Sequence, residues 1–170
     1  MTTESDAPEV MNAWAICLQA AEEARRRGDR RVGTDHVLLA LLESPSIEVV
    51  LGVSLQQARQ ALDSLDHEAL AALGLGSGAD APPLPMRAVP KKPRFRDVAR
   101  KDRLRMAPAA KKVLEDASKS NRRGLHITAQ QVLAQILALQ PPDPASALLG
   151  ALGVNPSEVR RRLDAVTPDS

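Results

Sequence analysis

The sequence predicts an all-α protein, built as a pseudo-twofold bundle of two four-helix repeats. Its 170 residues include one Trp, one Phe and no Tyr. A core made of Leu, Val, Ile and Ala favours packed helices over a β-sandwich. A stretch that begins at Val32 recurs in outline from Ile127, and the entry Gly52-Val53-Ser54 recurs as Gly153-Val154-Asn155. Because neither repeat alone has enough apolar surface for a stable core, we expect each to bury the other.

The bulk properties are those of an ordinary globular protein, with 44% hydrophobic and 26% charged residues. Cys17 is the single cysteine, which excludes an internal disulfide framework and fits a reducing compartment. No apolar run approaches the length that spans a bilayer, and the acidic N-terminus does not read as a signal peptide. We therefore expect a cytoplasmic protein with no membrane contact.

The first repeat is predicted at residues 9–73, after a flexible N-terminus at residues 1–8. Its first helix is expected to begin near Pro8, a tolerated first-turn residue, and to end at Gly28, a plausible C-cap. The apolar residues that recur in it at helical spacing, and that we expect to be buried, are Trp14, Cys17, Leu18 and Ala21, with Ile16, Ala20 and Ala24 widening the stripe.

The second helix follows Val32, and Thr34 or Gly33 can serve as its N-cap. Asp35 lies in its first turn, where the helix dipole favours a carboxylate. The apolar residues that make this helix nearly all buried are Val37, Leu38, Leu39, Leu41 and Leu42. Ser44-Pro45-Ser46 ends it, and a short apolar piece follows at residues 47–51. Ser54 and Gln57 then form a capping box for a helix with Leu55, Ala58, Leu62 and Leu65 on its buried face, followed by a final turn or helix that ends at Gly74.

Residues 74–105 are predicted to be a linker, rich in Gly and Pro and then basic. Residues 86–105 hold nine Lys or Arg and two Asp or Glu, a net charge of +7, whereas the remainder of the chain holds 14 and 19, a net charge of −5. Residues 94–105 have a composition that allows a helix. The candidate residues for docking to an acidic partner are Lys91, Lys92, Arg94, Arg96, Arg100 and Lys101.

Two other interpretations of the basic segment stay open. It is equally well explained as a solvated connector. It can also contact the phosphates of nucleic acid, although only Phe95 is available in it to stack on a base.

The second repeat is predicted at residues 106–166, before a tail at residues 167–170. Its first helix begins after Met106-Ala107-Pro108 and buries Val113, Leu114 and Ala117. Thr128 and Gln131 form a capping box for the next helix, which ends at Pro141-Pro142. A third helix covers residues 145–152. Asn155 caps the last, with Pro156 first in the helix and Glu158 closing the box, and Arg160-Arg161-Arg162 on a solvated face.

No group of residues requires an enzyme. His36, His67 and His126 have no second ligand at metal spacing, and His36 is expected to be a packed or hydrogen-bonding residue. Cys17 lies on an apolar stripe, as a buried inert thiol does. We expect no catalytic residue, no metal and no cofactor.

The segments 22–28, 32–42, 52–59 and 108–115, in this order and spacing, resemble the Clp N-terminal domain of ClpC- and ClpA-type AAA+ unfoldases. The resemblance covers residues 10–73 and 106–165. It implies an eight-helix fold of two Clp-N repeats that receives substrates and adaptor proteins for the attached ATPase. In the ClpC branch it also implies recognition of phosphorylated arginine through the acidic residue of a G-T-E-H segment.

That acidic position is Asp35 here, beside Thr34, and its counterpart in the second repeat is the neutral Gln130. Thr34, Asp35 and Gln130 are therefore the candidate ligand-binding residues. No G-x-x-x-x-G-K-[ST] motif occurs, so the motor is absent from this sequence. We expect a stand-alone module that acts as a regulator, adaptor or decoy of the Clp protease. It would bind Clp substrates, adaptors, unfoldase or protease subunits, or Clp-targeting small molecules. The alternative is a nucleic-acid-associated protein that uses the basic segment.

Overall fold

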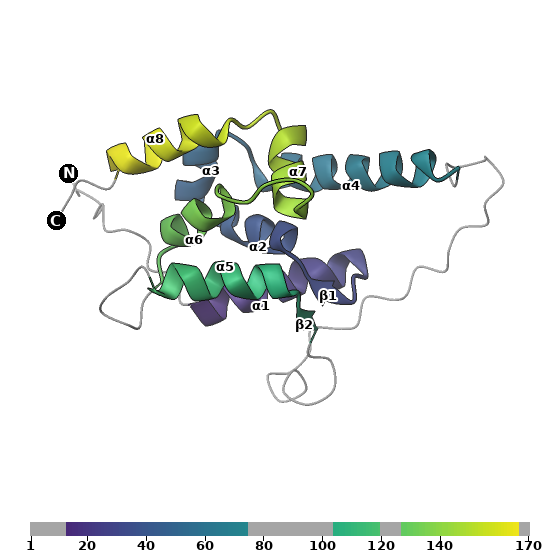
Figure 1. Ribbon diagram of the computed structural model, residues 1–170, viewed down its shortest axis with the longest axis horizontal. Helices are drawn as coiled ribbons and strands as arrows, with labels where there is room; N and C mark the ends of the chain where they lie inside the picture. Colours follow the sequence, from purple (N-terminus) through teal and green to yellow (C-terminus); the bar gives the residue numbers. More distant parts are fainter. Residues whose placement is uncertain (1–12, 75–103, 120–126, 167–170) are drawn as a thin grey trace, which may run out of the picture.

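The computed structural model describes residues 13–74, 104–119 and 127–166 (Figure 1). In chain order these residues form α1 (Ala13–Arg27), β1 (Arg31–Val32), α2 (Thr34–Leu41), α3 (Pro45–Leu51), α4 (Leu55–Ala72), β2 (Arg105–Met106), α5 (Pro108–Lys119), α6 (Ala129–Ile136), α7 (Pro144–Ala151) and α8 (Pro156–Val166). The predicted all-α bundle is confirmed for this part of the chain. The helix start near Pro8 and the six candidate basic residues from Lys91 to Lys101 lie outside the described residues.

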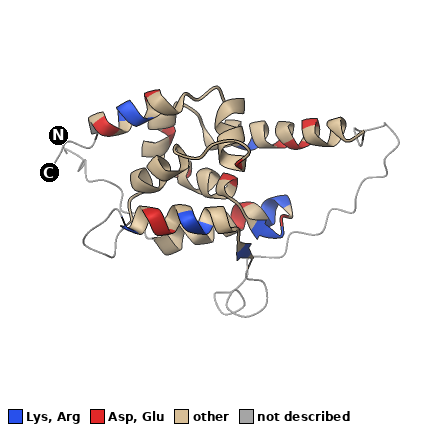
Figure 2. Cartoon of the chain, in the orientation of Figure 1, with Lys and Arg blue, Asp and Glu red and all other residues tan. Residues whose placement is uncertain are grey.

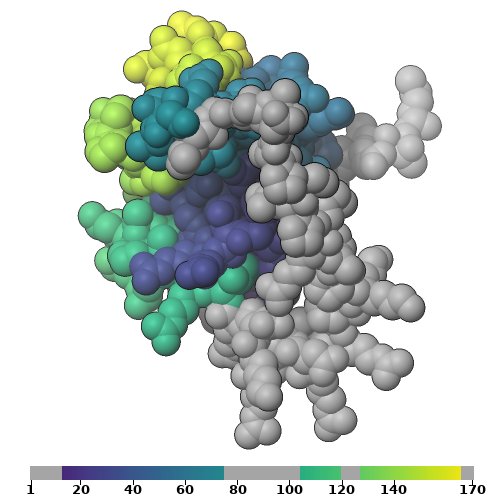
Figure 3. Space-filling model, turned by 90° about the vertical axis from the view of Figure 1, so that its right-hand side faces the viewer, coloured from purple at the N-terminus to yellow at the C-terminus, as the bar shows by residue number. Residues whose placement is uncertain are grey.

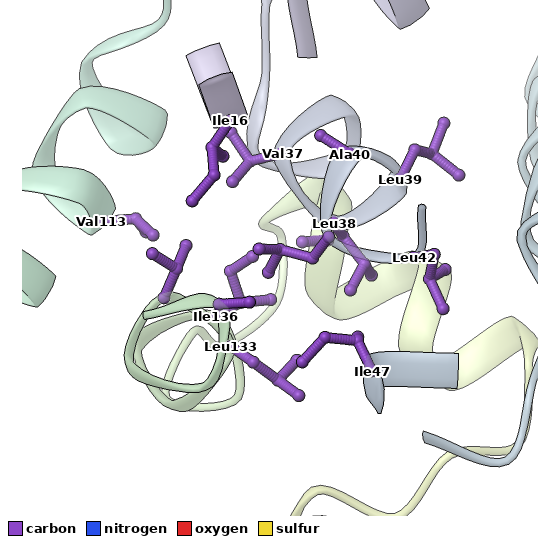
Figure 4. Packing of buried hydrophobic residues seen from close by; sticks show 14 of the residues in the cluster. Ile16, Val37, Leu38, Leu39, Ala40, Leu42, Ile47, Val113, Leu133 and Ile136 are labelled. Carbon is purple, nitrogen blue, oxygen red and sulfur yellow. The ribbon is translucent and has the colours of Figure 1, made fainter. Parts of the chain in front are cut away.

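Helix α2 is the centre of the fold. All eight of its residues are buried, and it contacts α1 and α4 of the first repeat as well as α5, α6 and α7 of the second. Figure 4 shows Val37 and Leu38 packed among side chains such as Ile136 that come from the other repeat. The two repeats therefore share one continuous core, as predicted.

Most helix starts follow the predicted capping residues. The Ser54 hydroxyl accepts a hydrogen bond from the Gln57 N–H at 3.3 Å, and the Gln57 side chain accepts one from the Ser54 N–H at 2.8 Å. Thr128 and Gln131 make the same reciprocal pair at the start of α6. At α8 the prediction is only half right: Asn155 accepts from the Ser157 N–H, but the Glu158 carboxylate pairs with Arg162 instead of closing the box.

The buried face of α1 differs from the prediction. Trp14 is 58% exposed and Cys17 is half-buried, whereas Ile16, Ala20 and Ala24 are completely buried. The small alanine side chains on this row let α1 lie close against α2, its main neighbour. Trp14 starts a row that repeats at the same spacing, so periodicity alone does not distinguish the two rows.

Two helices are longer than predicted. The short apolar piece at residues 47–51 belongs to α3, which begins at Pro45, because proline is tolerated in a first helical turn. Helix α4 is continuous from Leu55 to Ala72, so the separate final turn is part of it. Its last residues are exposed, and it extends away from the body of the molecule in Figure 1.

The described end of the basic segment is extended and not helical. β1 and β2 form a parallel pair, in which Arg31 is the register partner of Arg105 and Val32 that of Met106. The Ala107 N–H also donates to the Val32 carbonyl at 2.8 Å. These hydrogen bonds to β1 hold Arg105 and Met106 in a strand and tie the start of the second repeat to the first.

The arginines of α8 are exposed, as expected for a solvated face, but two of them have structural contacts. Arg160 donates to the Leu137 carbonyl at 2.6 Å, and Arg162 donates to the Val50 carbonyl at 3.3 Å. They thus satisfy carbonyl groups at the ends of α6 and α3, which have no partner within their own helices. None of the described helices has the length and apolar character needed to cross a membrane.

Candidate functional site

An open hollow of about 680 Å³ lies where the end of α1, β1 and the first turn of α2 meet α4 and α7. Half of its lining residues carry charged or polar side chains, and the other half are apolar residues and Gly33, so that most of the exposed lining surface is apolar. The lining residues are Arg27, Asp29, Arg30, Arg31, Gly33, Asp35, His36, Leu62, Leu65, Asp66, Ala69, Ala107, Pro144 and Ala147. Asp35 is the one sequence candidate among them. In Figure 3 this side of the molecule faces the viewer, with the end of α1 in purple below the teal α4.

Asp35 is held at the start of α2 by its two neighbours. It is 8% exposed, and its Oδ1 lies 3.3 Å from His36 Nδ1. The same oxygen lies over Gly33, where an added Cβ would come within 2.2 Å of it. Burial opposes ionisation of this carboxyl, but the hydrogen bonds and the charge of His36 outweigh it and lower the pKa of Asp35. Asp35 is therefore a carboxylate at neutral pH.

His36 is a buried hydrogen-bonding residue, as predicted. Its Nδ1 accepts a hydrogen bond from the Gly33 N–H at 3.0 Å, and its Nε2 lies 2.9 Å from Asp29 Oδ2. In the neutral ring Nδ1 is thus the acceptor, and Nε2–H donates to Asp29. Burial acts to lower the pKa of His36, but the flanking Asp35 and Asp29 carboxylates raise it overall. Protonation at Nδ1 replaces the hydrogen bond accepted from the Gly33 N–H with one donated to Asp35 Oδ1, 3.3 Å away.

Thr34 lies beside Asp35 in sequence but has a different environment. Its side chain is 1% exposed, and its hydroxyl donates to Asp143 Oδ1 at 2.7 Å. The same hydroxyl accepts from the Ala145 N–H at 3.3 Å. Thr34 therefore links the start of α2 to the start of α7, and its side chain is not part of the hollow's lining.

Gln130, the candidate of the second repeat, is the second residue of α6. It is half-buried and does not line the hollow. Of the three candidates only Asp35 lines the hollow, whereas the Thr34 side chain contacts the start of α7 and Gln130 lies on α6. The polar residues at the start of α2 and at the start of α6 thus have different surroundings.

The charged wall of the hollow contains residues that the sequence reasoning did not single out. Arg27 joins α1 to α4 through ion pairs with Asp63 at 2.8 Å and with Asp66. Its Nε also lies 3.4 Å from Asp29, and these carboxylates keep its pKa raised despite the opposing effect of burial. The arginine run before Gly28, followed by two more arginines, is the sequence signal that would have pointed here.

Arg30 and Arg31 are exposed and form no ion pair with the described residues. The acidic groups of the hollow, in contrast, have partners: Asp29 and Asp35 contact His36, and Asp66 contacts Arg27. The hollow therefore presents a carboxylate with a histidine partner beside cations that are free to bind an anion.

The described residues contain no group of three or more His, Cys, Asp or Glu side chains that would hold a metal ion. Burial raises the pKa of the half-buried Cys17 thiol, which opposes formation of the reactive thiolate.

Comparison with known proteins gives a likeness of fold. No protein-family model and no curated protein matches the sequence. Among solved structures, the fold is similar to the crystal structure of the N-terminal domain of the caseinolytic protease associated chaperone ClpD from Arabidopsis thaliana. The TM-score is 0.58 at 19% sequence identity, over 89% of this chain and 94% of the ClpD domain. This likeness shows that the chain has a Clp-N-like fold.

Proposed function

We propose that this chain is a protein-interaction module of the Clp system, without catalytic activity, which binds Clp substrates or adaptors in the cytoplasm and thereby regulates their proteolysis. The fold supports this proposal, because a Clp-N-like bundle covers nearly all of the chain. The hollow at the start of α2 is the proposed binding site. The observation that carries the proposal is that one open hollow is lined by the Asp35 carboxylate and by Arg30, which has no ion pair with the described residues.

A phosphorylated arginine of the partner is the proposed ligand group. It carries a guanidinium, which a carboxylate binds with two parallel hydrogen bonds, and a phosphoryl group, which arginine side chains bind. Asp35 supplies the carboxylate and Arg30 the cation. Both lie in the first repeat, so we propose one binding site per chain.

His36 allows the Asp35 carboxylate to exchange its contact with the His36 ring for a contact with the ligand. When the ring is neutral, its Nδ1 accepts from the Gly33 N–H and its Nε2–H donates to Asp29. Asp35 can then leave the ring for a ligand guanidinium without depriving His36 of a partner. Protonation of His36 turns Nδ1 into a donor that holds the Asp35 carboxylate, so ligand binding is expected to weaken in acid.

Calorimetric titration with free phosphoarginine tests the ligand. We expect binding to the wild type, loss of binding in Asp35→Asn, and unchanged binding in Asp164→Asn, a matched change at an exposed aspartate of α8. Arginine and inorganic phosphate are titrated separately, because the first carries only the guanidinium and the second only the phosphate group. Absence of heat with the wild type, or equal affinity in Asp35→Asn, would exclude phosphoarginine at this site.

Protein capture tests the broader function. The wild-type chain, used as bait in a lysate of its own cells, is expected to retain Clp subunits, adaptors or Clp substrates. Capture that recovers none of these above the level of an unrelated bait would count against a role in the Clp system, whatever the outcome with phosphoarginine.

A further inference from the structure

A second basic feature lies at the edge of the hollow, on the solvent side of the β1–β2 pair, and shares Arg31 with the hollow's lining. Val32 and Met106 are register partners that pack on the core, Val32 fully and Met106 in part. Because successive side chains of a strand point to opposite faces, their neighbours Arg31 and Arg105 both point away from the core. Both are exposed. Figure 2 shows the blue of this corner at the end of α1 and on β2.

This arrangement is unfavourable for the fold by itself. Neighbouring strands are about 4.8 Å apart, and like charges directly opposite each other on paired strands are destabilising. Within residues 13–74, 104–119 and 127–166, neither Arg31 nor Arg105 has an ion-pair partner that would offset the repulsion. Arg26 and Arg30, also exposed, add to the positive charge nearby.

From this geometry we propose that Arg31 and Arg105 form a docking site for the carboxylate side chains of an acidic protein segment. A carboxylate placed between two guanidinium groups accepts hydrogen bonds from both and removes their mutual repulsion. This inference rests on the proposed function, in which the partner is a protein. It adds that the partner carries Asp or Glu near the residue bound in the hollow.

The surroundings favour an acidic peptide over nucleic acid. A nucleic-acid duplex carries one negative charge for about every 1.7 Å of its length. A backbone that ran past this corner would therefore place phosphates near the carboxylates of Asp29, Asp35 and Asp66 in the adjoining hollow, which would repel them. Trp14, the one aromatic among the described residues, is about 20 Å away along α1 and cannot stack on bases bound at this corner. A peptide with separate carboxylates can bind at the corner without placing a continuous row of negative charges along the hollow.

The test uses fluorescence anisotropy with three labelled probes: a ten-residue peptide of alternating Glu and Gly, the same peptide with Gln in place of Glu, and a ten-nucleotide oligothymidine. The full chain is compared with the double variant Arg31→Gln/Arg105→Gln. Lys112→Gln/Arg161→Gln is the control, because it removes the same charge from two exposed positions on α5 and α8.

We expect the Glu peptide to bind the wild type, and its Kd to rise at least tenfold in Arg31→Gln/Arg105→Gln but less than twofold in the control. The Gln peptide should not bind. Asp35→Asn should leave binding of the Glu peptide unchanged, so this result stays separate from the phosphoarginine test. The midpoint of urea unfolding should stay the same or rise in Arg31→Gln/Arg105→Gln, because a repulsive pair has been removed.

Three results would overturn the proposal. Equal losses in the two double variants would mean that only net charge matters. Tighter, Arg31- and Arg105-dependent binding of oligothymidine than of the Glu peptide would assign the corner to nucleic acid. A lower urea midpoint in Arg31→Gln/Arg105→Gln would mean that the two arginines are retained for stability.

Discussion

The Thr34 hydroxyl donates a hydrogen bond to Asp143 Oδ1 at 2.7 Å and so joins the first turn of α2 to the N-cap of α7. Asp143 also accepts from the Ala145 N–H at 2.9 Å, and the same N–H reaches the Thr34 hydroxyl at 3.3 Å. The start of a second-repeat helix is therefore capped in part by a first-repeat side chain. This buried polar contact fixes how α7 lies against α2, alongside the apolar core.

Replacing Thr34 by Val removes this contact with little change in side-chain volume. The N-cap carboxylate of Asp143 then loses a buried donor, so we expect a loss of about 1–3 kcal/mol in the free energy of unfolding. Urea unfolding followed by circular dichroism measures it. Ser64→Ala, on an exposed face of α4, is the control and should change little. Stability equal to the wild type in Thr34→Val would show that the contact contributes nothing to the joining of the repeats.

Glu23 and Arg59 form a pair between α1 and α4. The Glu23 side chain is 1% exposed, and Arg59 binds both of its oxygens, with Nε 3.1 Å from Oε2. The hydrogen bond to Glu23 is the main reason that the pKa of Arg59 is raised. Arg59→Met leaves a buried carboxylate without its partner, so we expect a loss of about 3 kcal/mol in the free energy of unfolding.

The double variant Glu23→Leu/Arg59→Met should recover most of that loss, because no buried charge then remains. Urea unfolding of both single variants and the double variant gives the coupling energy. Arg161→Met controls for the loss of a surface charge. Additive losses in the double variant would show that the two side chains act independently.

Stability should depend on pH through His36. Its pKa is raised in the folded protein by Asp35 and Asp29, so the folded state binds a proton more tightly than the unfolded state. The stabilisation is complete below the ordinary histidine value of about 6.5 and is lost as the pH rises through the higher folded value. The midpoint of urea unfolding of the wild type should therefore decrease as the pH is raised from 5.5 to 8.5.

His36→Gln should flatten this part of the profile, since glutamine does not titrate and can still accept the Gly33 N–H. Asp35 acts in the opposite direction: its lowered pKa gives stability that is present above the ordinary aspartate value and is lost in acid as the pH falls through the lower folded value. A wild-type profile parallel to that of His36→Gln between pH 5.5 and 8.5 would contradict the role of His36.

Gly33 is required for space and not for backbone freedom, because its φ of −90° suits any residue. A Cβ there would lie 2.2 Å from Asp35 Oδ1, so Gly33→Ala must displace the carboxylate from His36. We expect a loss of about 1–3 kcal/mol in the free energy of unfolding, and a fall in the His36 pKa measured by NMR titration. Asp35→Ala removes the clashing oxygen. Gly33→Ala made in the Asp35→Ala background should therefore have little further effect, and an undiminished loss there would place the strain elsewhere.

Local sequence signals were sufficient for the helices and for much of the core. Ser54 with Gln57 and Thr128 with Gln131 mark helix starts, because a capping box is made between residues three positions apart. The run Val37–Leu42 is buried as predicted, since a helix that is apolar on all sides has to lie inside. The same reasoning failed for α1, where two rows with the same period compete and only the fit against α2 decides between Trp14 and Ile16.

The sequence by itself thus determined the all-α class and most helix starts, because these depend on residues within one or two turns of each other. The tertiary structure alone decided which residues from distant parts of the chain lie together. The contacts of Thr34 with Asp143, Arg27 with Asp63 and Arg31 with Arg105 join residues that are 36 or more positions apart. Such contacts depend on how the helices pack. Side-chain periodicity shows that a face is buried, but carries no information about the element that covers it.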